Sequence, residues 1–145
     1  GLSLQGKEEQ TREKISYLYD TEAAPDLQEI IDLLRQHELT ANTFLSFGRY
    51  LDVVPARASK GQALRYVAQR LGIALDKVLV AGGSGADEDM MRGNTLAVVV
   101  ANRHDELSLL PEADNIFHAT KDYSGGILEA LEHYDFFGDC GATDA

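Results

Sequence analysis

The sequence lacks most features of an extracellular, membrane or nucleic-acid-binding protein. Its single cysteine, Cys140, excludes an internal disulfide and any metal site built from several cysteines. No apolar run approaches the ~20 residues that a membrane-spanning helix needs, and the N-terminus has no signal-peptide core. Only 13 basic residues face 24 acidic ones, and the net charge of −11 argues against nucleic acid or an anionic membrane as a partner. A cytoplasmic location is expected.

The composition is nevertheless that of a folded chain. Of 145 residues, 44% are hydrophobic and 26% are charged, which is enough to bury a core in one ordinary domain or two very small ones. An acidic protein can still bind a phosphorylated small molecule, because a local pocket can be basic. No internal repeat or low-complexity tract occurs.

The first part of the chain predicts a small α+β segment. Residues 1–13 are polar and are expected as an irregular lead-in. The sequence then shows, in order, alternating apolar residues, apolar residues at near-helical spacing after Asp26, and a hairpin signal around Gly48-Arg49. The expected elements are a strand at 14–19, a helix at 26–38 and two strands at 40–47 and 50–54. Residues 14–57 are interpreted as one cap-like segment.

The second part predicts half of a doubly wound α/β fold. Ser59 is a good N-cap and Gly72 a good terminator for the helix between them. The strands expected here have no polar alternation, as strands covered on both faces should. The expected elements are helices at 60–71, 88–92 and 124–134 and strands at 77–81, 96–101 and 115–118. We expect residues 58–137 to form a partial parallel core whose sheet needs further strands, and 138–145 to form a loose tail.

A glycine-rich turn, Gly82 to Asp87, joins a predicted buried strand to a predicted helix. Strand, glycine turn and helix are the parts of an α/β phosphate or metal site, because glycines allow close backbone approach and the helix begins with free N–H groups. A carboxylate would normally follow the strand to hold a cation, but Gly83 has no side chain. Glu88 and Asp89 are interpreted as charges that suit the helix N-terminus.

Two segments in this order, ASKGQAL at 58–64 and the turn at 82–87, resemble the haloacid dehalogenase-like phosphatases that carry an α/β cap before their third motif. Within that superfamily, ASKGQAL, LVAGGSGADEDMM and NTLAVVVAN look most like the phosphatase-like domain of sucrose-phosphate synthases. The resemblance covers residues 14–135. It implies a haloacid dehalogenase-like α/β core, a sugar-phosphate ligand and Mg²⁺.

The resemblance assigns candidate roles to individual residues. Lys60 matches the lysine that would pair with a nucleophilic aspartate and the substrate phosphate, and Ser59 and Arg57 are candidates for contacting the same phosphate. Asp87 matches the second acid of the metal-binding turn. Gly83 stands where that family has a metal-binding aspartate, and Ala86 where an asparagine is usual. Since Mg²⁺ usually takes one or two carboxylates, its affinity should be weakened.

The superfamily's first motif, an Asp-x-Asp-x-Thr turn that supplies the nucleophile and the acid/base, has no match in this chain. Asp20 follows a predicted strand, but it is better interpreted as a turn residue than as a nucleophile. The preferred hypothesis is therefore a phosphatase-like, catalytically inactive domain of a sucrose-phosphate synthase. It would bind sugar phosphate, stabilise the synthase or recruit a true phosphatase. The full protein would transfer glucose from UDP-glucose to fructose 6-phosphate.

Two other functions stay open. One is an active Mg²⁺-dependent sugar-phosphate phosphatase whose missing core half is supplied elsewhere, and the other is a cytosolic interaction module without ligand. A dinucleotide fingerprint starting at Gly83 is disfavoured, because Glu88 occupies the third glycine position and would oppose a pyrophosphate. His104-Asp105-Glu106 is interpreted as a solvated loop. His37, His118 and His133 lack ligand spacing, and Arg49 is held open between sugar-phosphate contact and surface charge.

Overall fold

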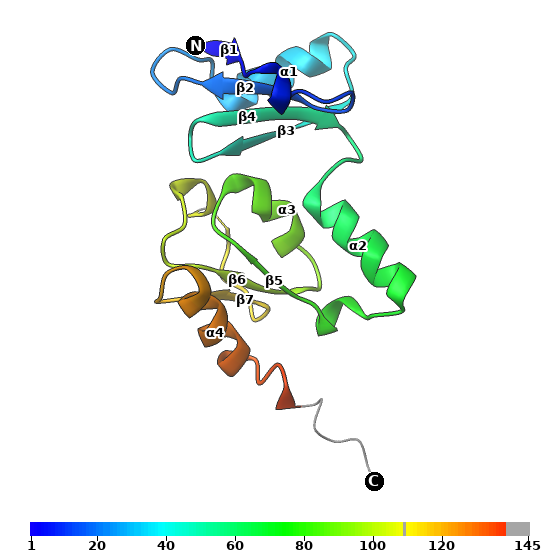
Figure 1. Cartoon of the computed structure of the whole chain (residues 1–145), viewed down its shortest axis with the longest axis vertical. Coiled ribbons are helices and arrows are strands. Elements are labelled where there is room, and N and C mark those ends of the chain that lie inside the picture. The colour runs from blue at the N-terminus through cyan, green and yellow to red at the C-terminus, as the bar shows by residue number, and fades with distance from the viewer. Residues whose placement is uncertain (109, 139–145) are drawn as a thin grey trace.

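A computed structural model describes residues 1–108 and 110–138 of the chain. It contains two sheets, one above the other in Figure 1, joined through the segment that leads into α2 (Lys60–Leu71). Cys140 and nearly all of the tail expected at 138–145 lie outside the described residues. Among the described residues, no helix is long and apolar enough to cross a membrane.

The first sheet is antiparallel, with strand order β1-β2-β4-β3. Its strands are β1 (Leu2–Leu4), β2 (Ile15–Tyr19), β3 (Ala41–Ser46) and β4 (Tyr50–Pro55). Helix α1 (Leu27–Gln36) begins at Asp26, whose carboxylate accepts the Gln28 N–H at 2.7 Å. The lead-in expected at 1–13 is therefore wrong in part, because β1 pairs with β2. The sheet also begins before residue 14, while the division of the chain into cap and core stays a prediction.

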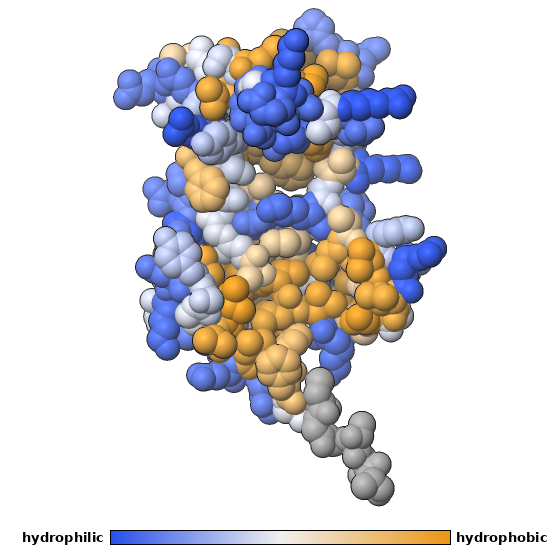
Figure 2. Space-filling model, viewed as in Figure 1, coloured by the Kyte–Doolittle hydropathy of each residue, from blue (hydrophilic) through white to orange (hydrophobic). Residues whose placement is uncertain are grey.

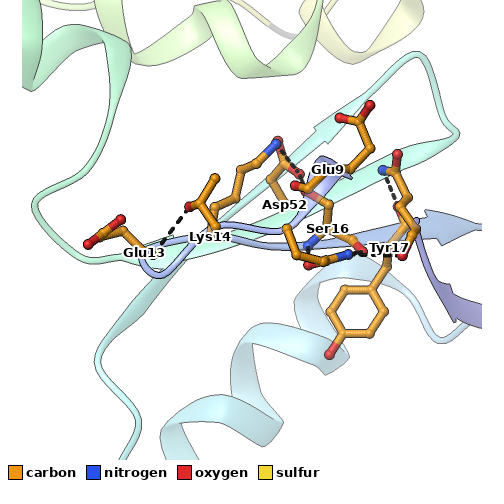
Figure 3. A network of polar contacts seen from close by, with 9 residues as sticks. Glu9, Glu13, Lys14, Ser16, Tyr17 and Asp52 are labelled. Atoms are coloured by element: carbon orange, nitrogen blue, oxygen red, sulfur yellow. Dashed lines mark hydrogen bonds and ion pairs between the residues drawn. The ribbon is translucent and has the colours of Figure 1, made fainter. Parts of the chain in front are cut away.

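A network of polar contacts lies on one face of this sheet, between β2 and β4 (Figure 3). Ser16 of β2 is fully buried, and its hydroxyl donates to Asp52 Oδ1 of β4 at 2.5 Å. Lys14 Nζ lies 3.5 Å from the same carboxylate oxygen. Tyr17, the next residue along β2, points to the opposite face, where Leu51 is fully buried. Alternation along the strands thus places this polar contact and Leu51 on opposite faces of the sheet.

The second sheet is parallel, with strand order β5-β6-β7. Its strands are β5 (Leu79–Gly82), β6 (Leu96–Val99) and β7 (Ile116–His118), and its further helices are α3 (Glu88–Met91) and α4 (Tyr123–His133). Val99 and Met91 lie in the buried cluster on one face of β6, whereas Val98 packs with Ala130 of α4 on the other. The predicted α/β class with a parallel sheet is confirmed, although α3 has only four residues.

Strand β5 lies at one end of this sheet, and within the described residues its outer edge pairs with no strand. Figure 2 shows apolar side chains gathered on this side of the molecule, beneath the first sheet. Several large apolar side chains on the two flanking helices are strongly exposed, among them Val67 and Leu71 of α2 and Leu128 of α4. A sheet with an open edge and an apolar flank is suited to receive further structure.

Candidate functional site

The candidate site forms where β5 ends and the chain turns into α3. Residues Gly85–Asp87 make a short 3-10 turn between them. Asp87 Oδ2 accepts the backbone N–H groups of Gly83 at 3.0 Å and Ser84 at 3.1 Å, and lies 3.3 Å from Ser84 Oγ. A Cβ on Gly82 would lie 2.4 Å from Asp87 Cβ, so this position needs glycine. The turn is thus closed around one carboxylate.

Lys60, the first residue of α2, reaches this carboxylate from the other side. Its ammonium lies 2.5 Å from Asp87 Oδ1. Burial raises the pKa of the Asp87 carboxyl, but the Lys60 ammonium and the N–H groups of Gly83 and Ser84 outweigh it and hold the pKa below its ordinary value. The Lys60 side chain is 55% exposed and that of Asp87 only 11%. The pair therefore presents a cation to solvent above an ionised, nearly buried anion.

Ser59 and Arg57, the other predicted phosphate contacts, lie just before α2. Ser59 Oγ caps the helix by accepting the Gln62 N–H at 3.1 Å. Arg57 is exposed. Arg49, whose role is open between a sugar-phosphate contact and a surface charge, places its guanidinium 5.5 Å from the Tyr50 ring centroid. The structure thus brings Lys60 and Asp87 together and gives Ser59 a local capping contact.

Asp20 is confirmed as a turn residue. Its Oδ1 accepts the Glu22 N–H at 3.1 Å, and its carbonyl accepts the N–H groups of Ala23 and Ala24. Asp89, interpreted from sequence as a helix-terminal charge, has a more specific contact. Its Oδ2 accepts the Gly61 N–H at 3.0 Å, so that α3 is fastened to the start of α2 beside Lys60.

The described residues do not by themselves fit a Mg²⁺ site. Mg²⁺ needs oxygen ligands in near-octahedral geometry. Asp87 already accepts from Lys60 with one oxygen and from the turn with the other, and Gly83 offers no carboxylate. Within residues 1–108 and 110–138, no group of three or more His, Cys, Asp or Glu side chains could hold a metal. A metal here would depend on carboxylates from other residues.

A cavity of about 530 Å³ opens beside the turn. Its lining includes Gly83 and Asp87 from the turn, Tyr123 from the start of α4 and Phe47 from the β3–β4 hairpin. Asn102, which also lines it, accepts the Tyr123 N–H through Oδ1 at 2.8 Å. The cavity thus joins the ends of the parallel strands to the tip of the first sheet, the usual position of a ligand in an open α/β fold.

Glu106 shows where the sequence interpretation was wrong. It was expected in a solvated loop, yet its side chain is only 14% exposed. Its carboxylate accepts the N–H groups of Gly48 at 2.7 Å and Gly85 at 2.7 Å. One signal in the sequence could have indicated a role for Glu106: it lies in the loop after a buried parallel strand. Such loops stand at the carboxyl ends of the strands, where sites form in open α/β sheets.

Comparisons with known proteins identify sequences related to this chain. A model of the sucrose-6F-phosphate phosphohydrolase family matches residues 1–135. The chain is 36% identical over 137 residues to the mannosylfructose-phosphate phosphatase of Agrobacterium fabrum, covering 92% of this chain and 55% of that protein. It is 33% identical over 128 residues to the glucosylglycerol-phosphate synthase of Pseudomonas anguilliseptica, covering 86% of this chain and 16% of that protein.

A solved structure is similar over nearly the same span. The sucrose-phosphatase of Synechocystis sp. PCC6803, solved with sucrose and phosphate, superposes with a TM-score of 0.85 at 29% sequence identity. The superposition covers 92% of this chain and 57% of the phosphatase. The chain therefore spans a little over half the length of the two phosphatases.

Proposed function

Because the chain belongs to the sucrose-6F-phosphate phosphohydrolase family, we propose that its site binds the phosphate of a phosphorylated sugar and takes part in removing it. The observation that carries this proposal is the Lys60–Asp87 pair, 2.5 Å apart and beside a cavity of about 530 Å³. The proposed substrate class is a phosphorylated disaccharide such as sucrose 6-phosphate. The names of the similar phosphatases support that class.

Lys60 suits the phosphate by charge and by donor number. An ammonium carries three N–H donors, and Asp87 takes one of them in the structure. The remaining donors can serve phosphate oxygens, whose negative charge must be balanced during phosphoryl transfer. Asp87 holds the ammonium at this position. Ser59 and Arg57 remain proposed as additional contacts to the same phosphate.

Hydrolysis needs groups that the described site does not contain. A phosphatase of this kind requires a nucleophilic carboxylate and an acid/base, and the carboxylates nearest the turn are already used as acceptors for backbone and Lys60 donors. We propose that a further core segment, adding to the unpaired edge of β5, brings these carboxylates and completes a Mg²⁺ site. The span of 57% of the Synechocystis phosphatase supports this arrangement.

A second candidate is a phosphatase-like domain that binds sugar phosphate without hydrolysing it, within a sucrose-phosphate synthase. Gly83 favours it, because the position lacks the metal-binding carboxylate expected there. The similarity to a segment making up 16% of a glucosylglycerol-phosphate synthase shows that such a sequence occurs within a larger synthase. The family match and the sucrose-phosphatase structure nevertheless favour the phosphatase over this alternative.

The two functions are separated by one assay series on the 145-residue chain, alone and mixed with the N-terminal half of a family phosphatase. Sucrose 6-phosphate is supplied with Mg²⁺, and released phosphate and bound ligand are both measured. Release that Lys60→Met abolishes supports the phosphatase. Binding that depends on Lys60, without release in either preparation, supports the non-hydrolysing domain. Absence of both binding and release contradicts both proposals.

A further inference from the structure

A single carboxylate joins the two sheets close to the candidate site. Glu106, in the loop after β6, accepts the N–H groups of Phe47 at 3.2 Å and Gly48 at 2.7 Å in the β3–β4 hairpin. The same carboxylate accepts the N–H of Gly85 at 2.7 Å in the turn that contains Asp87. Hydrogen bonds to an ionised acceptor are about twice as strong as neutral ones. Glu106 therefore fixes the hairpin tip relative to the turn.

The backbone packing at this junction is tight. A Cβ on Gly85 would lie 2.6 Å from the Leu45 carbonyl oxygen of β3 and 3.0 Å from Glu106 Oε2. Only a residue without a side chain lets β3, Glu106 and the turn meet here. The junction is thus built from three chain segments that are far apart in the sequence.

Phe47 is the side chain that this junction orients. Its φ of 58° lies in the left-handed region, which is uncommon for a residue other than glycine. Its N–H is one of the three held by Glu106. The residue is 59% exposed and lines the cavity beside Gly83 and Asp87, and its ring meets the His104 ring edge-on at 6.2 Å between centroids. A strained backbone thus holds an aromatic ring over the candidate site.

We propose that Glu106 is a positioning residue that fixes Phe47 as part of the cavity wall for the sugar part of the ligand, whose phosphate would bind at Lys60. The inference rests on the proposed function for the nature of the ligand. An exposed aromatic face suits the apolar C–H face of a sugar ring, and aromatic side chains commonly line such cavities. Glu106 acts through Phe47 and does not itself touch the phosphate.

Amide hydrogen exchange tests the junction without any ligand. In Glu106→Gln, the side-chain NH₂ replaces one of the two acceptor oxygens, so exchange should accelerate either at Gly48 or at both Phe47 and Gly85. Glu132→Gln, an exposed substitution on α4, is the matched control and should leave these amides unchanged. Unaltered exchange at the three amides in Glu106→Gln, with its fold retained by circular dichroism, overturns the junction.

Two probes then separate positioning from a general structural role. Glu106→Gln and Phe47→Ala should weaken sucrose 6-phosphate binding about tenfold, while inorganic phosphate, which has no sugar part for Phe47 to contact, binds as to the unchanged chain. Equal weakening of both probes, or of neither, overturns the positioning of Phe47. If the unchanged chain binds neither probe, the proposed function fails and the role of Phe47 in sugar binding fails with it. The exchange experiment judges the Glu106 junction in either case.

Discussion

Lys60 and Asp87, 27 residues apart in the sequence, meet with their charged atoms 2.5 Å apart. The contact joins the first turn of α2 to the turn after β5. A cation at a helix N-terminus is unfavourable with respect to the helix dipole, so the ion pair offsets a local cost. The arrangement leaves more than half of the Lys60 side chain exposed to a ligand.

Lys60→Met should therefore remove phosphate binding while retaining the fold. Methionine keeps most of the aliphatic length and loses the charge. We expect at least about tenfold weaker binding of inorganic phosphate, or roughly 1.4 kcal/mol, measured by isothermal titration calorimetry. Lys7→Met, at an exposed position in the first segment, is the matched control. Equal binding by Lys60→Met and the unchanged chain contradicts the role of Lys60.

Acidification should weaken the turn through Asp87. Since its folded-state pKa lies below the ordinary value of 3.8, the ionised carboxylate stabilises the fold above about pH 4. This contribution is lost as the pH falls through the lower folded-state pKa. Asp87→Asn should lower the free energy of unfolding by about 1–3 kcal/mol at pH 7, and the difference should shrink by pH 3.

Denaturant unfolding at the two pH values measures this difference. Asp20→Asn, at an exposed turn, controls for the loss of one negative charge. A difference between Asp87→Asn and the unchanged chain that is the same at pH 7 and pH 3 would show that ionisation of Asp87 contributes nothing to stability.

Substitution of aspartate at the neighbouring positions Gly82 and Gly83 should affect stability very differently. At Gly83, a Cβ meets Val100 Cγ2 at 3.3 Å and Arg103 Cα at 3.7 Å, so Gly83→Asp needs only a small shift of the valine. At Gly82, it meets Asp87 Cβ at 2.4 Å, so Gly82→Asp should destabilise the chain by about 1–3 kcal/mol. Gly83→Asp should strengthen Mg²⁺ binding, followed by calorimetric titration, and change stability by less than about 1 kcal/mol. Unchanged Mg²⁺ affinity would mean that a carboxylate at this position does not reach a metal.

The apolar flank beside β5 should cause the chain to associate. Val67 and Leu71 of α2 are 51% and 67% exposed, next to an unpaired strand edge. We expect the double substitution Val67→Glu, Leu71→Glu to reduce association in sedimentation experiments. Leu33 of α1, which lies with the first sheet, is 54% exposed, and Leu33→Glu should leave association unchanged. A chain that is monomeric before and after substitution shows that this surface is not adhesive.

Elements with local signals were well predicted from the sequence. Helix α2 is capped by Ser59 and terminated at Gly72, as the pattern indicated, and the φ of 69° at Gly72 lies in the left-handed region that favours glycine. Strands β5 and β6 are apolar runs that only burial on both faces explains. Strand β1 was missed because its three residues are too few for their alternation to indicate a strand, and its conformation depends on pairing with β2.

The site was predictable only where its partners are side chains. Lys60 and Asp87 were singled out because both residue types carry charge and both match a resemblance at the right spacing. Glu106 was missed because its partners are the backbone N–H groups of Phe47, Gly48 and Gly85, which leave no mark on residue identity. Its burial likewise depends on how two sheets meet, which no local pattern encodes.

The buried Ser16–Asp52 contact also specifies the alignment of two strands. Side chains alternate between the faces of a sheet, so a slip of β2 by one residue along β4 would turn Ser16 toward Leu51 and the apolar face. The hydroxyl would then be buried without Asp52, at a cost of about 1–3 kcal/mol. Apolar side chains alone would tolerate such a slip more readily. One hydroxyl and one carboxylate thus disfavour any pairing of β2 with β4 other than the observed one.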